Sequence, residues 1–594
     1  MADFRKLLLV LIAGAFLFAA VASADNYACS ATAVPTLARA EGLAEQMGDV
    51  LLKCAGTVPT TGLIANIRLT LTTYITSPNR GPFTDATMIL DEGIVGGVPQ
   101  QFKGYPSTTY IPFVDGSQNV YQAVRISDTE VEWQDVVLAG PGSAGYTTIR
   151  LTNVRGNANR LGDAGNATIQ AYVNITAPTA VPVNNNLVTV ADTRIGLTFS
   201  VTSGTFKNCV SPTSIVLKFR EGFSNAFRPV LTAGAPNVFP GGPYANESGW
   251  NPGPGALATG SVLASQALIG MADQGTRLMS RVKNNPSGVR LTFPNRVVVS
   301  DGNTPVNGMT LQIVSSPNAD GSGGTVTSDN GSTTFTDSAF LVVYEVVSLQ
   351  GASISFQETV PITVGTSYSI PGPLGTGTAS GTFAPLSTIA KASDSSSATT
   401  DFKRALVPRF VDKGVDTTWY TINPCRTILL FPYITQAGVQ FDTGIAIANT
   451  SMDPWGTLYG TGNATVPQAG ACRLFYYGST NGGAAPAMQT SPIVPAGGEL
   501  IYALSSGGGV TANGGTFTAC AAGNCIAPLF TGYMFAVCDF QFAHGYAFIS
   551  DYGAQKLAQG YLALIVPDIP FRDPGNRADT AFGSDLNAGE QLSN

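Results

Sequence analysis

The most regular alternation of large and small positions lies near the C-terminal end of the chain, between residues 540 and 548. Every second residue there is large, namely Phe540, Phe542, His544, Tyr546 and Phe548, with glutamine, alanine and glycine between them. This period of two predicts a β-strand with one face of large side chains and one of small. A face so rich in aromatic residues normally faces a core, so we expect His544, the single histidine, to be buried and structural.

In the preceding residues, 533–537, both the odd and the even positions are apolar, which predicts a strand covered on both faces. As one extended strand the stretch 533–549 would exceed roughly 50 Å, so we expect a bend, bulge or turn near Asp539 or Gly545. Similar patterns recur along the chain. The clearest predict strands at 50–54, 66–75, 120–126, 147–154, 167–175, 195–201, 214–219, 288–293, 309–315, 340–349 and 353–360.

Turn-forming residues separate these strands, since the chain has 67 glycines and 37 prolines, and helical periodicity is scarce. The predicted fold class is therefore all-β, with tandem β-sandwich domains of the Ig-like or jelly-roll-like kind and little helix. At 594 residues the chain is too long for one core. We expect a signal peptide at 1–24, a first β-sandwich domain at 25–222, a Gly/Pro-rich connection at 223–256, a second β-sandwich domain at 257–390, a linker at 391–420, a C-terminal β-sandwich domain with disulfides at 421–570 and a disordered tail at 571–594.

The first residues have the pattern of a secretory signal. Arg5 and Lys6 precede an apolar run from Leu7 to Ala20, and Ala22-Ser23-Ala24 matches a cleavage site. No later apolar segment is long enough to cross a bilayer, so we expect no transmembrane segment after cleavage, and a secreted or cell-surface protein. Only 12% of residues are charged and the formal net charge is -7, which argues against nucleic acid as a partner.

All eight cysteines follow the predicted cleavage site, and an even number in an exported chain favours disulfides. Cys520 and Cys525 flank a short Gly/Ala loop and are the expected local pair, while the other pairings stay open. If all are paired, at least one bridge joins the N-terminal part to the C-terminal part. Zinc fits poorly, because there is no C-x-x-C motif and only one histidine. The disulfide candidates are Cys29, Cys54, Cys209, Cys425, Cys472, Cys520, Cys525 and Cys538.

Catalytic motifs are sparse. A Ser or Cys nucleophile needs an adjacent base, usually His, and His544 is the sole candidate. Ser280 and Lys283 match S-x-x-K, and residues 328–330 read Ser-Asp-Asn, but the K-T-G element of β-lactamase-like enzymes is absent. A glycosidase needs only two carboxylates, so this alternative stays open. Its candidates are Asp91 with Glu92, Glu130 and Glu132 with Asp135, and Asp539 with Asp551.

Two segments, 318–324 and 329–331, have the composition of calcium loops but lack the ligand spacing and closing Glu of an EF-hand. Hairpin turns explain them, because Asp-Gly and Asn-Gly favour tight turns. The Gly-rich segment 375–381 lacks the spacing and following helix of a dinucleotide site. We therefore predict no cofactor, no metal and no catalytic residue.

Several motifs resemble those of a group of large, uncharacterised secreted all-β proteins of environmental bacteria. These are Arg39-Ala40-Glu41-Gly42 with Gly48-Asp49 and Cys54, Leu151-Thr152-Asn153-Val154-Arg155, Ala272-Asp273-Gln274-Gly275-Thr276-Arg277, Cys425-Arg426-Thr427, the run from Phe441 to Thr450, and Gln541-Phe542-Ala543-His544-Gly545. The resemblance covers most of the mature chain and implies no particular activity. Residues 443–449, 472–477 and 494–498 resemble parts of extracellular β-sandwich modules, which are more often adhesive or structural than catalytic.

The sequence thus predicts a secreted structural or adhesive protein, at the cell surface or in an extracellular assembly, without catalytic activity. Its expected partners are other protein subunits or extracellular polysaccharide, and a homo-oligomer is one form of such assembly. The alternatives are a carbohydrate-binding protein and, after it, a two-carboxylate polysaccharide-cleaving enzyme. Trp250, Trp419 and Trp455 discriminate between the first two, because exposed coplanar rings favour glycan binding and buried rings favour a scaffold.

Overall fold

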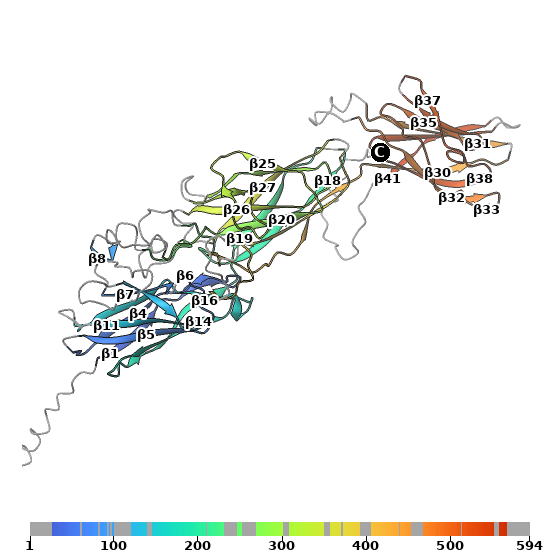
Figure 1. Ribbon diagram of the computed structural model, residues 1–594. Coiled ribbons are helices and arrows are strands. Elements are labelled where there is room, and N and C mark those ends of the chain that lie inside the picture. The colour runs from blue at the N-terminus through green and yellow to red at the C-terminus, as the bar shows by residue number, and fades with distance from the viewer. Residues whose placement is uncertain are drawn as a thin grey trace, which may run out of the picture.

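The computed structural model describes residues 27–59, 62–80, 83–91, 94–95, 98–99, 120–138, 140, 145–209, 211–230, 246–251, 269–300, 308–349, 357–369, 372–392, 405–438, 440–452, 467–512, 514–551 and 557–566. Within these ranges the chain is almost entirely β, with one short 3-10 helix, η1 (Asn159–Leu161). The strands form three units that follow one another along an elongated molecule (Figure 1). Each unit has its own hydrophobic core, which confirms the all-β, tandem β-sandwich prediction.

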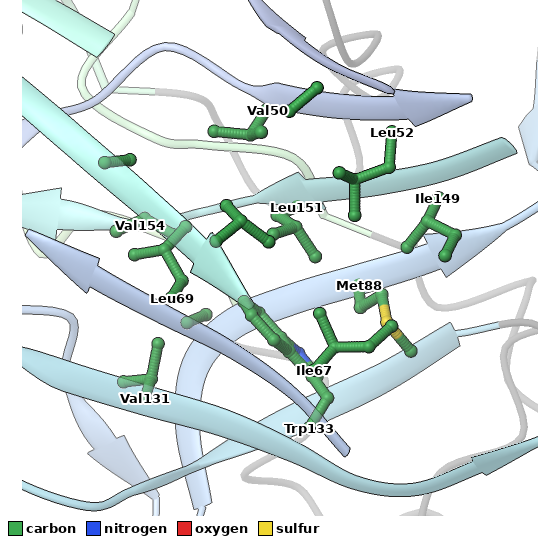
Figure 2. Packing of buried hydrophobic residues seen from close by; sticks show 14 of the residues in the cluster. Val50, Leu52, Ile67, Leu69, Met88, Val131, Trp133, Ile149, Leu151 and Val154 are labelled. Carbon is green, nitrogen blue, oxygen red and sulfur yellow. The ribbon is translucent and has the colours of Figure 1, made fainter. Parts of the chain in front are cut away.

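The first unit is a twelve-stranded sheet that curls round one core. Contacts between β1 and β16, which stand far apart in the sheet order, show that the sheet encloses that core. Trp133 lies at its centre against Ile67 and Met88 (Figure 2). The strands are β1 (Ala28–Ala33), β2 (Thr36–Arg39), β4 (Val50–Ala55), β5 (Leu63–Leu71), β6 (Asn79–Arg80), β7 (Phe83–Leu90), β10 (Val120–Arg125), β11 (Glu130–Leu138), β12 (Thr147–Thr152), β14 (Thr168–Thr176), β15 (Val183–Asn184) and β16 (Leu187–Arg194), in the order β15-β1-β4-β12-β7-β10-β11-β5-β14-β16-β2 with β6 beside β7. Two short pairs, β3 (Glu45–Gln46) with β13 (Arg155–Gly156) and β8 (Ile94–Val95) with β9 (Val98–Pro99), accompany it.

The second unit packs a five-stranded sheet against an eight-stranded one. The first sheet has the order β17 (Leu197–Thr202), β19 (Ile215–Glu221), β27 (Thr359–Ser367), β21 (Arg290–Pro294) and β25 (Ser332–Phe335). The second has the order β18 (Gly204–Lys207), β29 (Thr417–Asn423), β28 (Gly375–Ala384), β20 (Arg277–Lys283), β26 (Phe340–Leu349), β23 (Gly308–Ser315) and β22 (Arg296–Ser300), with β24 (Thr325–Val326) beside β23. Inward residues of both sheets, such as Phe219 and Trp419, share one core.

The third unit is a sandwich of two six-stranded sheets. One sheet, here called sheet K, has the order β33 (Gly483–Ala484), β32 (Cys472–Thr480), β38 (Phe530–Cys538), β30 (Thr427–Thr435) and β41 (Leu564–Val566), with β34 (Gln489–Thr490) beside β32. The other, sheet L, has the order β37 (Phe517–Ala519), β36 (Gly507–Thr511), β35 (Glu499–Ala503), β31 (Phe441–Asn449), β39 (Ala543–Asp551) and β40 (Ala558–Leu562). The expected turn near Asp539 is present, because β38 ends at Cys538 and β39 begins at Ala543 in the opposite sheet.

Two segments join a different unit from the one expected. β17, β18 and β19 fall within the predicted first domain, yet all three pair with strands of the second unit. Residues 405–423 fall mostly within the predicted linker, yet Phe410 is buried in the second core and β29 pairs with β28 and β18. The reason is that these segments pair with strands from distant parts of the chain, which local composition does not indicate. The domain limits themselves stay a prediction. The predicted signal peptide, most of the connection 223–256 and the tail 571–594 lie outside the described residues.

All eight cysteines form disulfides within the chain. Two bridges, Cys29–Cys54 and Cys472–Cys538, join paired strands of one sheet, and Cys520–Cys525 closes a local loop. Cys209–Cys425 connects residues 216 positions apart and ties the second unit to the start of the third. One bridge thus joins the N-terminal and C-terminal parts.

Candidate functional site

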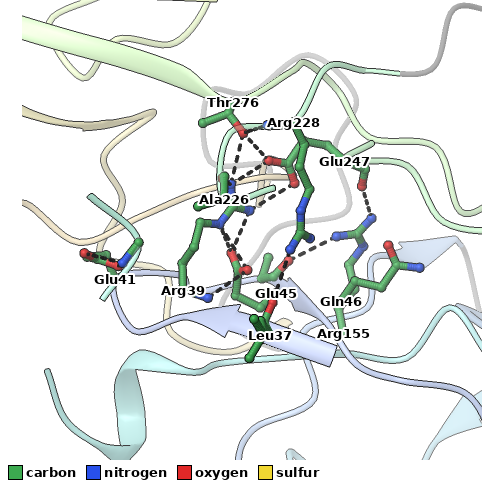
Figure 3. Close-up of polar contacts among 12 residues, drawn as sticks. Leu37, Arg39, Glu41, Glu45, Gln46, Arg155, Ala226, Arg228, Glu247 and Thr276 are labelled. Carbon is green, nitrogen blue, oxygen red and sulfur yellow. Dashed lines mark hydrogen bonds and ion pairs between the residues drawn. The ribbon is translucent and has the colours of Figure 1, made fainter. Parts of the chain in front are cut away.

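A cluster of buried charged residues lies where the first unit meets the second (Figure 3). Arg39, at the end of β2, is fully buried, and its Nε donates to Glu45 Oε1 at 2.9 Å. Its Nη1 and Nη2 donate to Oε1 and Oε2 of Glu247 at 2.7 and 3.0 Å. Further bonds reach Ala226 O and Thr276 Oγ1, both at 3.0 Å. Arg39 therefore binds three segments that lie far apart in the sequence.

Two more arginines complete the cluster. Arg155 donates to the carbonyl oxygens of Ala44 and Glu247, and Arg228 donates to those of Asn225 and Leu37. Burial lowers the pKa of both guanidinium groups, and the nearby carboxylates Glu247 and Glu45 oppose that shift. Three guanidinium groups and two carboxylates thus share one buried cluster.

The paired groups at the centre keep each other charged. Burial alone would raise the pKa of Glu247, but the adjacent Arg39 outweighs it and the pKa is lowered. Burial likewise opposes the charge on Arg39, yet Glu247 and Glu45 raise its pKa. Removing one partner from such a pair strands a buried charge, at a cost of about 3–5 kcal/mol. The arrangement fixes the first unit onto the second; it exposes no group to a substrate.

Sequence reasoning did not single out this cluster. A signal was nevertheless present, because three of the quoted motifs, 39–42, 151–155 and 272–277, each contribute a residue to it.

Two further buried carboxylates lie near the junction. Glu41 accepts bonds from the backbone N–H of Gly196 and Leu197, at the start of the second unit, and burial raises its pKa. Glu221 accepts from Phe227 N at 2.7 Å and Glu358 N at 2.9 Å. Burial raises the pKa of Glu221 to about 7, which makes it titrate near neutral pH.

A small cavity of about 180 Å³ opens beside Glu41 at the same junction. Phe199, Phe383, Lys413 and Thr417 are among its lining residues. Ligand sites for small molecules usually occupy about 300–1,000 Å³. The cavity is smaller than that range, and it holds one carboxylate, so it does not form a two-carboxylate site.

The prediction that His544 is buried is wrong. Ala543 and Ala547 face the core, whereas Tyr546 and Phe548 are each 43% exposed and His544 is partly exposed. The small face of β39 points inward because Phe431 and Leu429 of sheet K fill the space: a side chain at Gly545 would meet Phe431 at 2.7 Å. Because large residues of the opposite sheet fill the core here, the small face of β39 is buried and the aromatic face is exposed, which is the reverse of the usual arrangement.

Glu130 and Glu132 lie two residues apart on one face of β11, but neighbouring polar side chains engage both of them, and the other candidates do not converge. Glu132 pairs with Arg68 at 2.8 Å, Glu130 accepts from Thr70, and Asp135 stands in a bulge of the same strand with a positive φ. Asp539 precedes β39 and Asp551 ends it, so a nine-residue strand, roughly 27 Å, separates them. Glycosidases need two carboxylates within about 10 Å. Asp91 accepts from Thr148 N, and Glu92 lies outside the described residues.

The remaining motifs have structural roles. Ser280 and Lys283 lie three apart on β20, so they point to opposite faces, and Lys283 pairs with Asp416. Asp329 accepts from Gly331 N within a turn. In the loop 318–324, Arg277 donates to the carbonyl oxygens of residues 321 and 323. Its guanidinium group therefore occupies oxygen atoms that a calcium ion would need as ligands. Among the described residues no group of three or more His, Cys, Asp or Glu side chains is arranged to hold a metal.

The described tryptophans favour a structural role over glycan binding. Trp250 and Trp419 are buried, at 1% and 0% exposure, and Trp455 lies outside the described residues. Two exposed tyrosines, Tyr477 and Tyr533, are nearly parallel, at 10° and 5.1 Å between ring centroids. At that separation parallel rings stack on each other, so they cover their own faces and form no flat platform for a sugar.

The outer face of sheet K is apolar over four strands apart from Arg473, which pairs with Asp539 at its edge. Leu474 and Met534 point into the core, so the alternate residues on β32 and β38 face outward. Directly paired positions form continuous rows across β32, β38, β30 and β41. The residues in these rows are Arg473, Val537, Ile428 and Val566; Phe475, Phe535, Leu430 and Leu564; and Tyr477 and Tyr533.

The outer face of sheet L is apolar as well. Ile501, Phe517, Tyr546, Phe548 and Leu562 are between 43% and 68% exposed. A soluble monomer rarely exposes large contiguous apolar patches, and those it does expose commonly mark interaction sites. The third unit carries one such patch on each side of its sandwich, and these two faces are the candidate functional site.

No protein-family model and no curated protein matches the chain. Among solved structures, the chain is similar to the major pilin subunit of Bacillus cereus, with 7% identity and a TM-score of 0.20, over 76% of this chain and 92% of that one. It is also similar to a serine-rich repeat adhesion glycoprotein from Streptococcus agalactiae, with 8% identity, a TM-score of 0.15, and coverage of 67% and 97%. It is similar as well to the pilus backbone of Streptococcus pneumoniae, with 10% identity and a TM-score of 0.15, over 89% of this chain and 88% of that one. Scores this low carry no argument about fold or function. None of the helices in the described residues is long and apolar enough to span a membrane.

Proposed function

We propose that the protein is an extracellular structural protein, without catalytic activity, that assembles with other protein subunits through its third unit. The observation that carries this proposal is the pair of apolar outer faces on sheets K and L. Water contact with such faces costs free energy in proportion to their area, about 25 cal/mol per Å², and docking of a partner removes that cost.

The rest of the molecule suits a rigid building block. Arg39 and its partners hold the first unit to the second, and Cys209–Cys425 ties the second to the third. Four disulfides accord with an oxidising compartment, where such bonds persist. Stiff junctions of this kind hold the first two units in a fixed position relative to the third unit, through which the protein assembles.

Light scattering of the mature chain tests this proposal. Wild-type protein is expected to give masses above that of one chain, rising with concentration, whereas a variant with both Tyr533→Lys and Tyr546→Lys is expected to stay monomeric. A wild type that stays monomeric, and that instead releases reducing ends from an extracellular polysaccharide, would contradict the proposal and favour the enzyme alternative.

A further inference from the structure

We propose that the outer face of sheet L is a homodimer contact, in which two copies of this chain pack face to face about a two-fold axis parallel to β31 and β39. This inference rests on the proposed function and assigns one of the two apolar faces to a second copy. Its occupant is argued from the register of two neighbouring strands, the apolar area and the placement of charge.

The register sets a ridge of large side chains beside a trough of small ones. On β39 the outward residues are His544, Tyr546 and Phe548, and their direct partners on β31 are Ala448, Ala446 and Gly444. The Tyr546 ring lies over Gly560 of β40, on the side away from β31, since a side chain at Gly560 would meet its hydroxyl at 1.8 Å, and it therefore leaves the small residues of β31 uncovered. A ridge and a trough of equal length therefore run side by side.

This arrangement is complementary to itself. A two-fold axis parallel to the strands, midway between β31 and β39, places the ridge of each copy over the trough of the other. Because directly paired residues stand at the same height along the strands, Tyr546 of one copy then meets Ala446 of the other, and Phe548 meets Gly444. Face-to-face sheets pack about 10 Å apart, a spacing that large-on-small contacts fill. One face thus supplies both the large and the small side chains of the contact. Such self-complementarity favours a second copy of this chain over a different partner.

The area suits a reversible dimer. Ile501, Phe517, Tyr546, Phe548 and Leu562 are between 43% and 68% exposed, so at about 150–250 Å² for a large side chain they present roughly 500 Å². Two copies would bury about 1,000 Å², the lower limit of specific interfaces. A contact of this size associates and dissociates with concentration instead of locking permanently.

Charge is placed at the margin of this face. Among the outward positions of β31, β35 and β39 the carboxylates stand at the two ends: Glu499 lies in the end row with Ala448 and His544, and Asp442 lies beyond Gly444 at the opposite end, where it accepts a bond from Ser505 Oγ. The next row, from Ile501 through Ala446 and Tyr546 to Leu562, is apolar across four strands. An uncharged centre with polar groups at the edge is the usual anatomy of a protein interface.

Sedimentation equilibrium of the full mature chain tests the inference with a matched pair of variants. Tyr546→Lys places a charge on the sheet L face, and Tyr533→Lys places the same charge on sheet K at nearly equal exposure, 43% and 42%. Tyr546→Lys is expected to raise the dimer dissociation constant at least about tenfold, and Tyr533→Lys to leave it unchanged. The reverse ordering overturns the inference but leaves the proposed function standing, because assembly then proceeds through sheet K. A wild type that is monomeric at every concentration overturns both.

Cross-linking gives a second test that does not depend on the folding of a charged variant. Chains carrying Ala446→Cys are mixed with chains carrying Tyr546→Cys and treated with a short bifunctional thiol cross-linker, because facing positions on sheets about 10 Å apart are beyond the reach of a disulfide. The two-fold axis brings these positions together, so the mixture is expected to yield a covalent dimer faster than either chain alone. A mixture of Ala446→Cys with Tyr533→Cys serves as the control. Equal rates in the two mixtures would rule out the proposed axis.

Discussion

Arg39→Met is expected to loosen the junction between the first and second units. The substitution keeps an unbranched side chain beneath the Phe410 ring, which lies 4.7 Å from the guanidinium, but leaves Glu45 and Glu247 buried without their cation. Breaking a buried ion pair from one side costs about 3–5 kcal/mol. For a unit of this size that corresponds to a fall of roughly 6–20 °C in its transition temperature.

Thermal unfolding followed by tryptophan fluorescence reports this change, because Trp133 and Trp250 are buried beside strands of the first unit. Lys283→Met is the control: its ion pair with Asp416 is about half exposed, and exposed pairs contribute about 0–1 kcal/mol. The deficit of Arg39→Met should also shrink from pH 8 to pH 5. Stranded carboxylates have a folded-state pKa above the unfolded value, so their penalty is present at high pH and relieved on protonation. A loss no larger than that of the control would refute the assignment of the cluster as a structural lock.

Three other outcomes follow from the structure. Burial raises the pKa of Glu221 from 4.5 to about 7, so its contribution to stability is fully present below pH 4.5 and is lost as pH rises through 7. Chemical unfolding of Glu221→Gln should show a fall in stability between pH 5 and 8 that is about 2.5 kcal/mol smaller than that of wild type, and a variant that parallels wild type would contradict this. Alkylation of the secreted protein without reductant should add no mass, since all eight cysteines are paired; labelled thiols would disprove the pairing. A protease site is inserted between residues 396 and 397, and the chain is cleaved there and Cys209–Cys425 is reduced. The two fragments should still elute together on gel filtration, because β29 remains hydrogen-bonded between β28 and β18. Separate elution would show that these strands do not hold the junction.

The all-β class could be predicted from the sequence, because the alternation in segments such as Leu63–Leu71 and Thr359–Ser367 is a local property of the chain. The turn after Asp539 was equally predictable, from length alone. Which face of a strand is buried was not, as β39 shows. The choice depends on what the opposite sheet presents, and Phe431 and Leu429 lie more than a hundred positions away in the sequence.

The buried cluster could not be assembled from sequence for the same reason. Arg39 and Glu247 are 208 positions apart, and nothing in either segment specifies the other as its partner. The predicted linker shows a related difficulty. Low-complexity residues near 393–400 indicate a boundary, but the burial of Phe410 and the pairing of β29 depend on grooves and strand edges formed by distant parts of the chain.

Electron microscopy of the extracellular material, with gold-labelled antibody against this chain, tests the central claim most directly. The account predicts label on regular assemblies, filaments or a layer, whose repeating contacts fall on the third unit, and it predicts that Tyr533→Lys with Tyr546→Lys disperses them. Label found only on single, unassociated molecules at the wild-type level of secretion would contradict the account.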